Sequence, residues 1–252
     1  MERILGGLLV IVVVGAIGHG IWLALQDADP APEPTVVSET PTPMTAPPPT
    51  AEPATATPEA PTPTNEPHPA TAVLAQLPIK ERDPLAGYSR SRFGDRWVDV
   101  DGNGCDQRND VLGRDLTDVE YRPGTRDCVV VTGMLADPFT GNTIAFTRGD
   151  VTSAEVQIDH VVALADAWQK GAQELDFETR QEFANDPLNL LAVDGPTNFL
   201  KGHRDAASWL PPNEAFHCEY VATQVAVKAK YRLWVTQTEH KAMVEVLSSC
   251  GP

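Results

Sequence analysis

The sequence predicts an α+β domain with few strands, stabilised by disulfides and preceded by a long non-globular region. Three observations carry this prediction. A β-branched run at 128–135 is followed by turn residues and a second short apolar run. Several later stretches have apolar residues at helical spacing. Four cysteines follow an apolar N-terminal segment of the kind that directs proteins to oxidising compartments.

The N-terminal segment Ile4–Leu25 has no charged side chain over 22 residues. That length spans the hydrocarbon core of a bilayer, which is about 30 Å thick. It also exceeds the apolar part of an ordinary signal peptide. Residues 1–26 are therefore expected to form either an uncleaved signal anchor, in contact with the membrane, or a cleaved signal peptide. Both alternatives place the protein outside the cytoplasm, membrane-anchored or secreted.

Residues 27–78 are expected to form a disordered linker rich in Pro, Thr and Ala. Of the 23 prolines in the chain, 15 lie between Pro30 and Pro78, and residues 27–78 contain no Lys or Arg. Proline fixes φ and removes a backbone donor, so such a segment favours an extended spacer over a packed core. The folded domain is accordingly expected at 79–252, where 80–99 forms a polar lead-in anchored by Trp97 and Val98.

The chain has a formal net charge of −16 at pH 7. Sequence-reading nucleic-acid binders gain much of their affinity from Lys and Arg that neutralise phosphates, so the acidic balance disfavours that class. It leaves open an enzyme that contacts a few phosphates through a metal ion. The sequence contains no P-loop, no GxGxxG and no GxSxG motif.

The first half of the domain is expected to contain an N-terminal β-hairpin. The run at 128–135, the turn residues at 137–142 and the run at 143–146 indicate its two strands and their connection. A short strand at 156–158 then leads into Asp159-His160. A helical stretch follows at 164–183, with Gly171 as an interruption.

The second half of the domain begins with a strand at 188–193 and a turn at 194–196. Thr197 is expected to cap the helix that follows. A further helix is predicted over 219–235. Residues 236–239 have the capping-box pattern and open a last helix that runs to Leu247.

The cysteines are Cys105, Cys128, Cys218 and Cys250. None of them forms a CxxC pair, which disfavours a zinc site. An even number behind an export signal indicates two disulfides. Among the three pairings, Cys105–Cys128 and Cys218–Cys250 are expected because each closes a local loop.

The candidate chemical centre combines Asp159, His160, Asn189 and Asn198. The first two end one predicted strand, Asn189 lies in the next, and Asn198 opens the following helix. The oxygens of Asp159 and Asn198 suit a hard divalent cation, with Mg²⁺ favoured and Mn²⁺ or Ca²⁺ as alternatives. His160 has the ordinary pKa that suits a general base near neutral pH.

Other side chains near this centre have supporting roles in the prediction. Asn189 is expected to orient His160 through a hydrogen bond to the imidazole or to the backbone. Lys201, His203 and Arg204 are expected to contact substrate phosphates. Adjacent residues of a strand point to opposite faces, so Asp159 and His160 need a strand end or a local twist to share one site.

Three segments in order carry a family resemblance: Ile-Asp-His-Val-Val at 158–162, Asn-Leu-Leu at 189–191 and Asn-Phe-Leu-Lys-Gly at 198–202. They resemble the HNH endonucleases, which have a ββα-metal (His-Me finger) core. The likeness extends to the branch shared by secreted bacterial proteins and the C-terminal domains of GmrSD-type restriction enzymes. It covers roughly 99–250, including 166–168, 183–187, 194–198 and 209–212.

The resemblance implies a ββα-metal core embedded in additional helices and the N-terminal hairpin. It also implies a hydrolytic nuclease with His160 as general base, Asp159 and Asn198 as metal ligands, and Asn189 as the orienting residue. Two departures from the family pattern stand out. Asn189 occupies a position that is His in other HNH enzymes, and His203 stands where the secreted branch has an acid.

The expected function is an extracytoplasmic, metal-dependent endonuclease that hydrolyses nucleic acid, with DNA favoured over RNA and no defined protein partner. The alternative is a non-catalytic binding or cell-surface module that retains the HNH scaffold, which the acidic charge favours. A cell-wall hydrolase would be supported by location alone.

The segment 99–110 matches the first half of a Ca²⁺-binding loop, but Asp110 replaces the usual bidentate Glu. Three interpretations stay open: a structural Ca²⁺ site, a turn that closes the Cys105 disulfide, or a contribution to the nuclease site through Asp106, Arg108 or Asn109.

Overall fold

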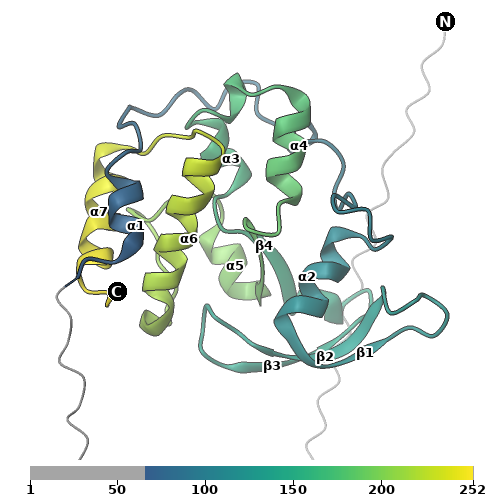
Figure 1. Cartoon of the computed structure of the whole chain (residues 1–252). Helices are drawn as coiled ribbons and strands as arrows, with labels where there is room; N and C mark the ends of the chain where they lie inside the picture. Colours follow the sequence, from purple (N-terminus) through teal and green to yellow (C-terminus); the bar gives the residue numbers. More distant parts are fainter. Residues whose placement is uncertain (1–65, 252) are drawn as a thin grey trace, which may run out of the picture. The chain divides into compact units, whose positions relative to one another are not determined.

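The computed structural model describes residues 66–251, which contain two small antiparallel sheets; the larger sheet lies at one edge, with the helices on one side of it (Figure 1). The larger sheet has the order β1-β2-β3, and the smaller one pairs β4 with β5. The predicted α+β class is therefore confirmed. The strands are β1 (Leu116–Tyr121), β2 (Val130–Ala136), β3 (Thr143–Thr147), β4 (Val156–His160) and β5 (Leu190–Asp194).

The helices fall into a long C-terminal pair and several short segments around it. The α-helices are α1 (Pro69–Leu74), α2 (Gln107–Asp115), α3 (Leu164–Trp168), α4 (Phe177–Asn185), α5 (Gly195–Lys201), α6 (His217–Lys230) and α7 (Gln237–Ser248). Single 3₁₀ turns are η1 (Arg90–Phe93), η2 (Thr152–Ala154), η3 (Ala172–Glu174) and η4 (Glu214–Phe216).

The predicted N-terminal hairpin is confirmed as β2 and β3, which pair from Thr132↔Thr147 to Ala136↔Thr143. A third strand, β1, was not predicted. Its register with β2 shifts twice, and Asp118 has a φ of 51°. Acidic residues disfavour strands, so this irregular strand with Asp118 and Glu120 lacks a clear sequence pattern.

The strands β4 and β5 pair in register, with Asp159 opposite Leu191 and His160 opposite Leu190. The helix α5 follows β5 directly. The expectation that Thr197 caps this helix is wrong: the Asp194 side chain accepts a 2.7 Å hydrogen bond from the Thr197 backbone nitrogen. Gly195 and Pro196 form the first turn, where proline is tolerated because its missing N–H would have no partner there.

The predicted interruption at Gly171 is confirmed. The backbone at Gly171 has a φ of 118°, a conformation that favours glycine. An added Cβ would also lie 3.0 Å from the Trp234 ring. The helical stretch predicted at 164–183 is consequently divided into α3, η3 and α4, and this long excursion separates β4 from β5.

Both predicted disulfides are confirmed. The Cα atoms are 5.2 Å apart in Cys105–Cys128 and 5.8 Å apart in Cys218–Cys250. The first joins the loop before α2 to the entry of β2, and the second joins the start of α6 to the end of α7. The capping box of α7 is also confirmed, with Thr236 and Glu239 bonded reciprocally to each other's backbone.

The folded unit begins within the segment that the sequence analysis assigned to the linker. The helix α1 packs beside α6 and α7, where Leu74 and Leu77 join a buried cluster with Tyr220 and Met243. Burial of these two leucines outweighs the proline-rich composition around them. The predicted N-terminal segment and residues 27–65 lie outside the described residues. None of the helices within 66–251 has both the length and the apolarity needed to cross a bilayer.

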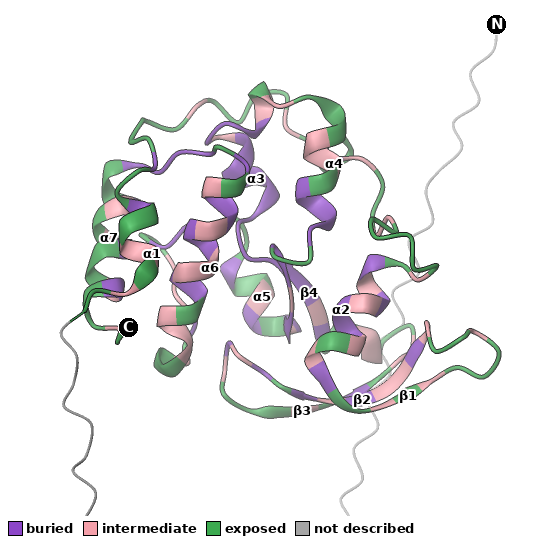
Figure 2. Cartoon of the chain, viewed as in Figure 1, coloured by how far each residue is buried: buried purple, intermediate pink, exposed green. Residues whose placement is uncertain are grey.

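A network of ion pairs connects five parts of the chain. Lys170 Nζ contacts carboxylate oxygens of Asp166 at 2.7 Å, Asp205 at 2.8 Å and Glu239 at 2.5 Å. Lys228 joins Asp166 and Glu239, and Arg82 joins Asp166 and Asp205 from the surface. Three cations thus balance three carboxylates around the buried helix α3 (Figure 2).

Candidate active site

The end of β4 presents Asp159 and His160 to different partners. Lys201, the last residue of α5, donates from Nζ to Asp159 Oδ2 at 2.5 Å and to the His160 carbonyl oxygen at 2.6 Å. Lys201 is fully buried and Asp159 nearly so. Burial raises the pKa of the Asp159 carboxyl and lowers that of the Lys201 ammonium, while each partner opposes the shift of the other.

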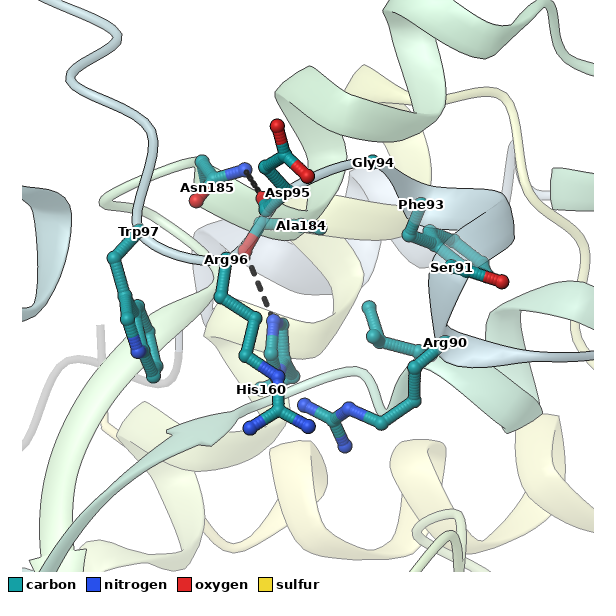
Figure 3. Close-up of a pocket in the computed structure, with 11 residues that line it drawn as sticks. Arg90, Ser91, Phe93, Gly94, Asp95, Arg96, Trp97, His160, Ala184 and Asn185 are labelled. Carbon is teal, nitrogen blue, oxygen red and sulfur yellow. Dashed lines mark hydrogen bonds between the residues drawn. The ribbon is translucent and has the colours of Figure 1, made fainter.

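The His160 ring is held from the opposite side by α4. Its Nε2 lies 2.9 Å from the Ala184 carbonyl oxygen (Figure 3). A carbonyl can only accept, so Nε2 carries the proton and Nδ1 of the neutral ring keeps a free lone pair. Burial lowers the pKa of His160 to about 3, and the positive charge of Arg90 acts in the same direction. The ring is therefore neutral at physiological pH, and the ordinary pKa expected from the sequence is not retained, because the fold buries the imidazole.

Two cavities meet at His160. The larger, which we call the α5 cavity, has a volume of about 410 Å³ and is bordered by Asp159, His160, Asn198 and His203. The smaller, which we call the arginine cavity, has a volume of about 310 Å³ and is bordered by His160, Ala184 and the segment around η1. His160, Arg90 and Leu164 border both cavities. The side chains of Asp159 and His160 point to opposite faces of β4. Both nevertheless border the α5 cavity, because they lie at the end of the strand.

The two asparagines of the predicted centre have different surroundings. Asn198 donates from Nδ2 to Gln157 Oε1 at 3.0 Å, which fixes the orientation of its amide. Asn189 is fully buried, accepts from the Val162 nitrogen at 2.8 Å and donates to the Val162 and Phe183 carbonyls at 3.3 Å. The sequence predicts that Asn189 bonds either the His160 imidazole or the backbone. The structure contains a backbone contact, which is made to Val162, two residues after His160.

The three residues expected to contact phosphate are separated by the fold. The Lys201 ammonium is buried and bonded inside the protein, so it does not face solvent. His203 is exposed and borders the α5 cavity. Arg204 is exposed, and it borders neither of the two cavities that meet at His160.

The segment 99–110 is organised by its own hydrogen bonds. The Asp99 carboxylate accepts from three backbone nitrogens, those of Gly102, Asn103 and Gly104. These bonds lower the pKa of Asp99. No group of three or more His, Cys, Asp or Glu side chains positioned to hold a metal ion occurs within residues 66–251. The contacts match the turn interpretation of this segment.

The residues Asp106, Arg108 and Asn109 serve the local structure. The Asp106 side chain caps α2 by accepting from the Asn109 nitrogen at 3.0 Å. Asn109 Oδ1 accepts from the Val130 nitrogen at 3.1 Å, and Arg108 donates to the Val156 carbonyl at 3.2 Å. Neither cavity at His160 includes these three residues.

Comparison with known proteins shows the family of the chain. The family model for the C-terminal domain of GmrSD restriction endonucleases matches residues 106–246, which include all four residues of the predicted centre. The chain belongs to this family. It is also 36% identical over 183 residues to an uncharacterized secreted protein of Arthroderma benhamiae, covering 72% of this chain and 84% of that protein. No solved structure matches the chain at a significant level.

The arginine cavity was not predicted from the sequence. Arg90 and Arg96 lie in the segment predicted as a polar lead-in, and Trp97, predicted there as an anchor, borders the cavity as well. A signal was present, because three arginines occur within 90–96 of a strongly acidic chain. The local charge of residues 90–96 indicates an anion-binding segment, which the net charge of the whole chain conceals.

Proposed function

We propose that this protein is an extracytoplasmic, metal-dependent endonuclease that hydrolyses phosphodiester bonds of nucleic acid, DNA in preference to RNA. The single observation that carries the proposal is the state of His160. Its Nε2–H is tied to Ala184, and its neutral ring borders a cavity together with Asp159 and Asn198. A fixed imidazole with a free lone pair at Nδ1, beside hard oxygen donors, is an arrangement that general-base hydrolysis with a metal uses.

The donors at the α5 cavity fit a hard divalent cation such as Mg²⁺, with Mn²⁺ or Ca²⁺ as alternatives. Asn198 uses its amide nitrogen on Gln157, which leaves the amide oxygen for a ligand. Asp159 would supply the carboxylate oxygen. A bound ion would stabilise the negative charge that develops on the phosphoryl group during hydrolysis.

The chain's own groups define the proton transfer. His160 would accept a proton from the attacking water at Nδ1, while the bond from Nε2 to Ala184 holds the ring plane. Asn189 restrains the backbone at Val162, immediately beyond the strand end. Lys201 joins the Asp159 carboxylate to the His160 carbonyl, so that two consecutive residues keep their relative position. In this proposal these contacts constitute a ββα-metal core built from β4, β5 and α5.

The proposed location follows from two observations. Two disulfides are typical of proteins in oxidising compartments. The relative from Arthroderma benhamiae is a secreted protein. The predicted signal anchor or signal peptide at 1–26 agrees with this location.

The experiment that tests the function is cleavage of plasmid DNA, of single-stranded DNA and of a structured RNA by the full-length, disulfide-bonded protein. Reactions contain Mg²⁺, Mn²⁺ or Ca²⁺, with EDTA as the control. Cleavage that needs a divalent ion and produces free 5′ or 3′ phosphate ends supports the proposal. Intact substrate with all three metals contradicts it.

A second candidate, the non-catalytic binding module, is favoured by the ion pair of Asp159. This carboxylate is the one acidic group among the residues that border the α5 cavity, and the Lys201 ammonium already neutralises it. Lys201→Met separates the two candidates. Tighter metal binding by this variant, without cleavage by either protein, favours the binding module.

A further inference from the structure

The arginine cavity carries positive charge in an acidic protein. Arg90 and Arg96 border it, and neither forms a salt bridge within residues 66–251. Both side chains are exposed, and Asp95, the one carboxylate among the residues that border the cavity, forms a salt bridge with neither of them. Within residues 66–251 the two arginines therefore hold charge that is not paired directly with a carboxylate.

The directions of these side chains define an anion site. Figure 3 shows both guanidinium groups extending toward the ring of His160, whereas the carboxylate of Asp95 points away from them. Two like charges that converge without a counter-charge repel each other, and a bound anion offsets that repulsion. The planar guanidinium matches the geometry of phosphate oxygens, so a phosphate is the anion that this pair suits best.

Trp97 adds an aromatic wall to the same cavity. Its backbone has a φ of 58°, in the left-handed region that large side chains rarely occupy. Such strain persists only where the surroundings fix it, and it is concentrated at functional sites. The half-buried indole packs against the cluster around Val111 and also borders the cavity beside Arg96. Aromatic rings at such positions stack on unpaired bases.

We propose that Arg90 and Arg96 bind a phosphate of the nucleic-acid strand beside His160, and that Trp97 stacks on an adjacent unpaired base. The proposal rests on the proposed function, because His160 marks where the scissile phosphate lies. A base in an intact duplex is stacked between its neighbours and does not reach the indole. The preferred substrate strand is therefore single-stranded or unpaired at that position.

The test measures binding separately from cleavage. A short fluorescein-labelled single-stranded oligonucleotide, and the same strand annealed to its complement, are titrated with full-length protein in EDTA and followed by fluorescence anisotropy. Arg90→Gln and Arg96→Gln are each expected to raise the Kd about tenfold and to reduce the slope of log affinity against log salt by about 0.7. The conservative variant Arg96→Lys should retain the salt slope but not the full affinity.

The matched control is Arg92→Gln. Arg92 is exposed on the same 3₁₀ turn as Arg90, but it borders neither cavity, so its Kd should equal that of the wild type. Trp97→Ala should remove the preference for the single strand over the duplex, whereas Trp97→Phe should retain it. Because Trp97 also packs against the core, circular dichroism of both variants confirms that they fold.

The outcomes separate this inference from the proposed function. Arg90→Gln and Arg96→Gln variants that bind like Arg92→Gln overturn the phosphate site, whether or not the protein cleaves. A wild type that binds duplex as well as single strand overturns the stacking role of Trp97. Arginine-dependent binding of the single strand by a protein that cleaves nothing with any metal supports the site and contradicts the nuclease.

Discussion

Substitution of Lys170 by methionine tests the buried charged network. The Lys170 ammonium contacts three carboxylates and is fully buried, so the variant leaves three acids with only two cations. Removing one partner of a buried ion pair costs about 3–5 kcal/mol, because the remaining charge is left uncompensated in a poorly solvated place. Methionine has a similar length, so most of the loss is electrostatic.

The remaining contacts place the expected loss at the lower end of that range. Asp166 keeps Lys228 and Arg82, Asp205 keeps Arg82 at 2.6 Å, and Glu239 keeps Lys228 at 2.9 Å. Every carboxylate thus retains at least one cation. We expect the free energy of unfolding to fall by about 3 kcal/mol, and the Tm by about 6–12 °C for a domain of this size.

The assay is urea unfolding followed by circular dichroism, with both disulfides intact. Lys241→Met is the control: Lys241 is exposed on α7 and lies outside the network, so its removal should leave the unfolding midpoint unchanged. A Lys170→Met variant within about 1 kcal/mol of the wild type would refute the reasoning, since that is the size of an ordinary surface pair.

Three further predictions concern other parts of the fold. Non-reducing peptide mapping should recover Cys218–Cys250 as a linked pair, and its replacement by two alanines should lower the free energy of unfolding by about 2–5 kcal/mol; free thiols in the exported protein would contradict this. Folding lowers the pKa of His160 from 6.5 to about 3, so the unfolded chain takes up the proton first as pH falls. The contribution of this residue to the free energy of unfolding is therefore fully present above pH 6.5 and is lost progressively toward pH 3. Urea midpoints measured across that window should decline less for His160→Gln, and an equal decline would show that other groups cause it. Asn189→Ala leaves buried groups at Val162 unpaired and should lower the cleavage rate and the Tm together; a normal Tm with normal cleavage would count against its restraining role.

Much of the fold follows from local patterns. A β-branched run followed by turn residues predicts β2 and β3, and the Thr236–Glu239 spacing predicts the start of α7. The break at Gly171 is likewise predicted from the glycine itself, whose φ of 118° favours this residue. In these cases the signal lies in the segment that it predicts.

Features that depend on distant contacts escaped prediction. The strand β1 is stabilised by pairing with β2 despite its acidic residues, and α1 by packing of Leu74 and Leu77 against α6 and α7. Asp194 caps α5 in place of Thr197 because the helix starts earlier than its proline suggests.

The candidate site shows the same division between local and distant contacts. The order of Asp159, His160, Asn189 and Asn198 predicts that they meet around one strand end. The residue types alone do not say that Lys201 turns inward onto Asp159, because a lysine at a helix end usually reaches solvent. Nor do they say that the chain at 90–97 returns to His160, a contact between segments more than sixty residues apart.

The role of His160 as general base is tested most directly by the single-turnover cleavage rate of His160→Ala at saturating Mg²⁺, with metal affinity measured in parallel by calorimetry. The account predicts a rate reduced by about 10²–10⁴-fold with metal affinity unchanged, because Asp159 and Asn198 remain. His203→Ala, at the exposed edge of the α5 cavity, should change KM more than kcat. A His160→Ala protein that cleaves at the wild-type rate would contradict the account, and loss of cleavage in His203→Ala alone would assign the base to the segment after α5 instead.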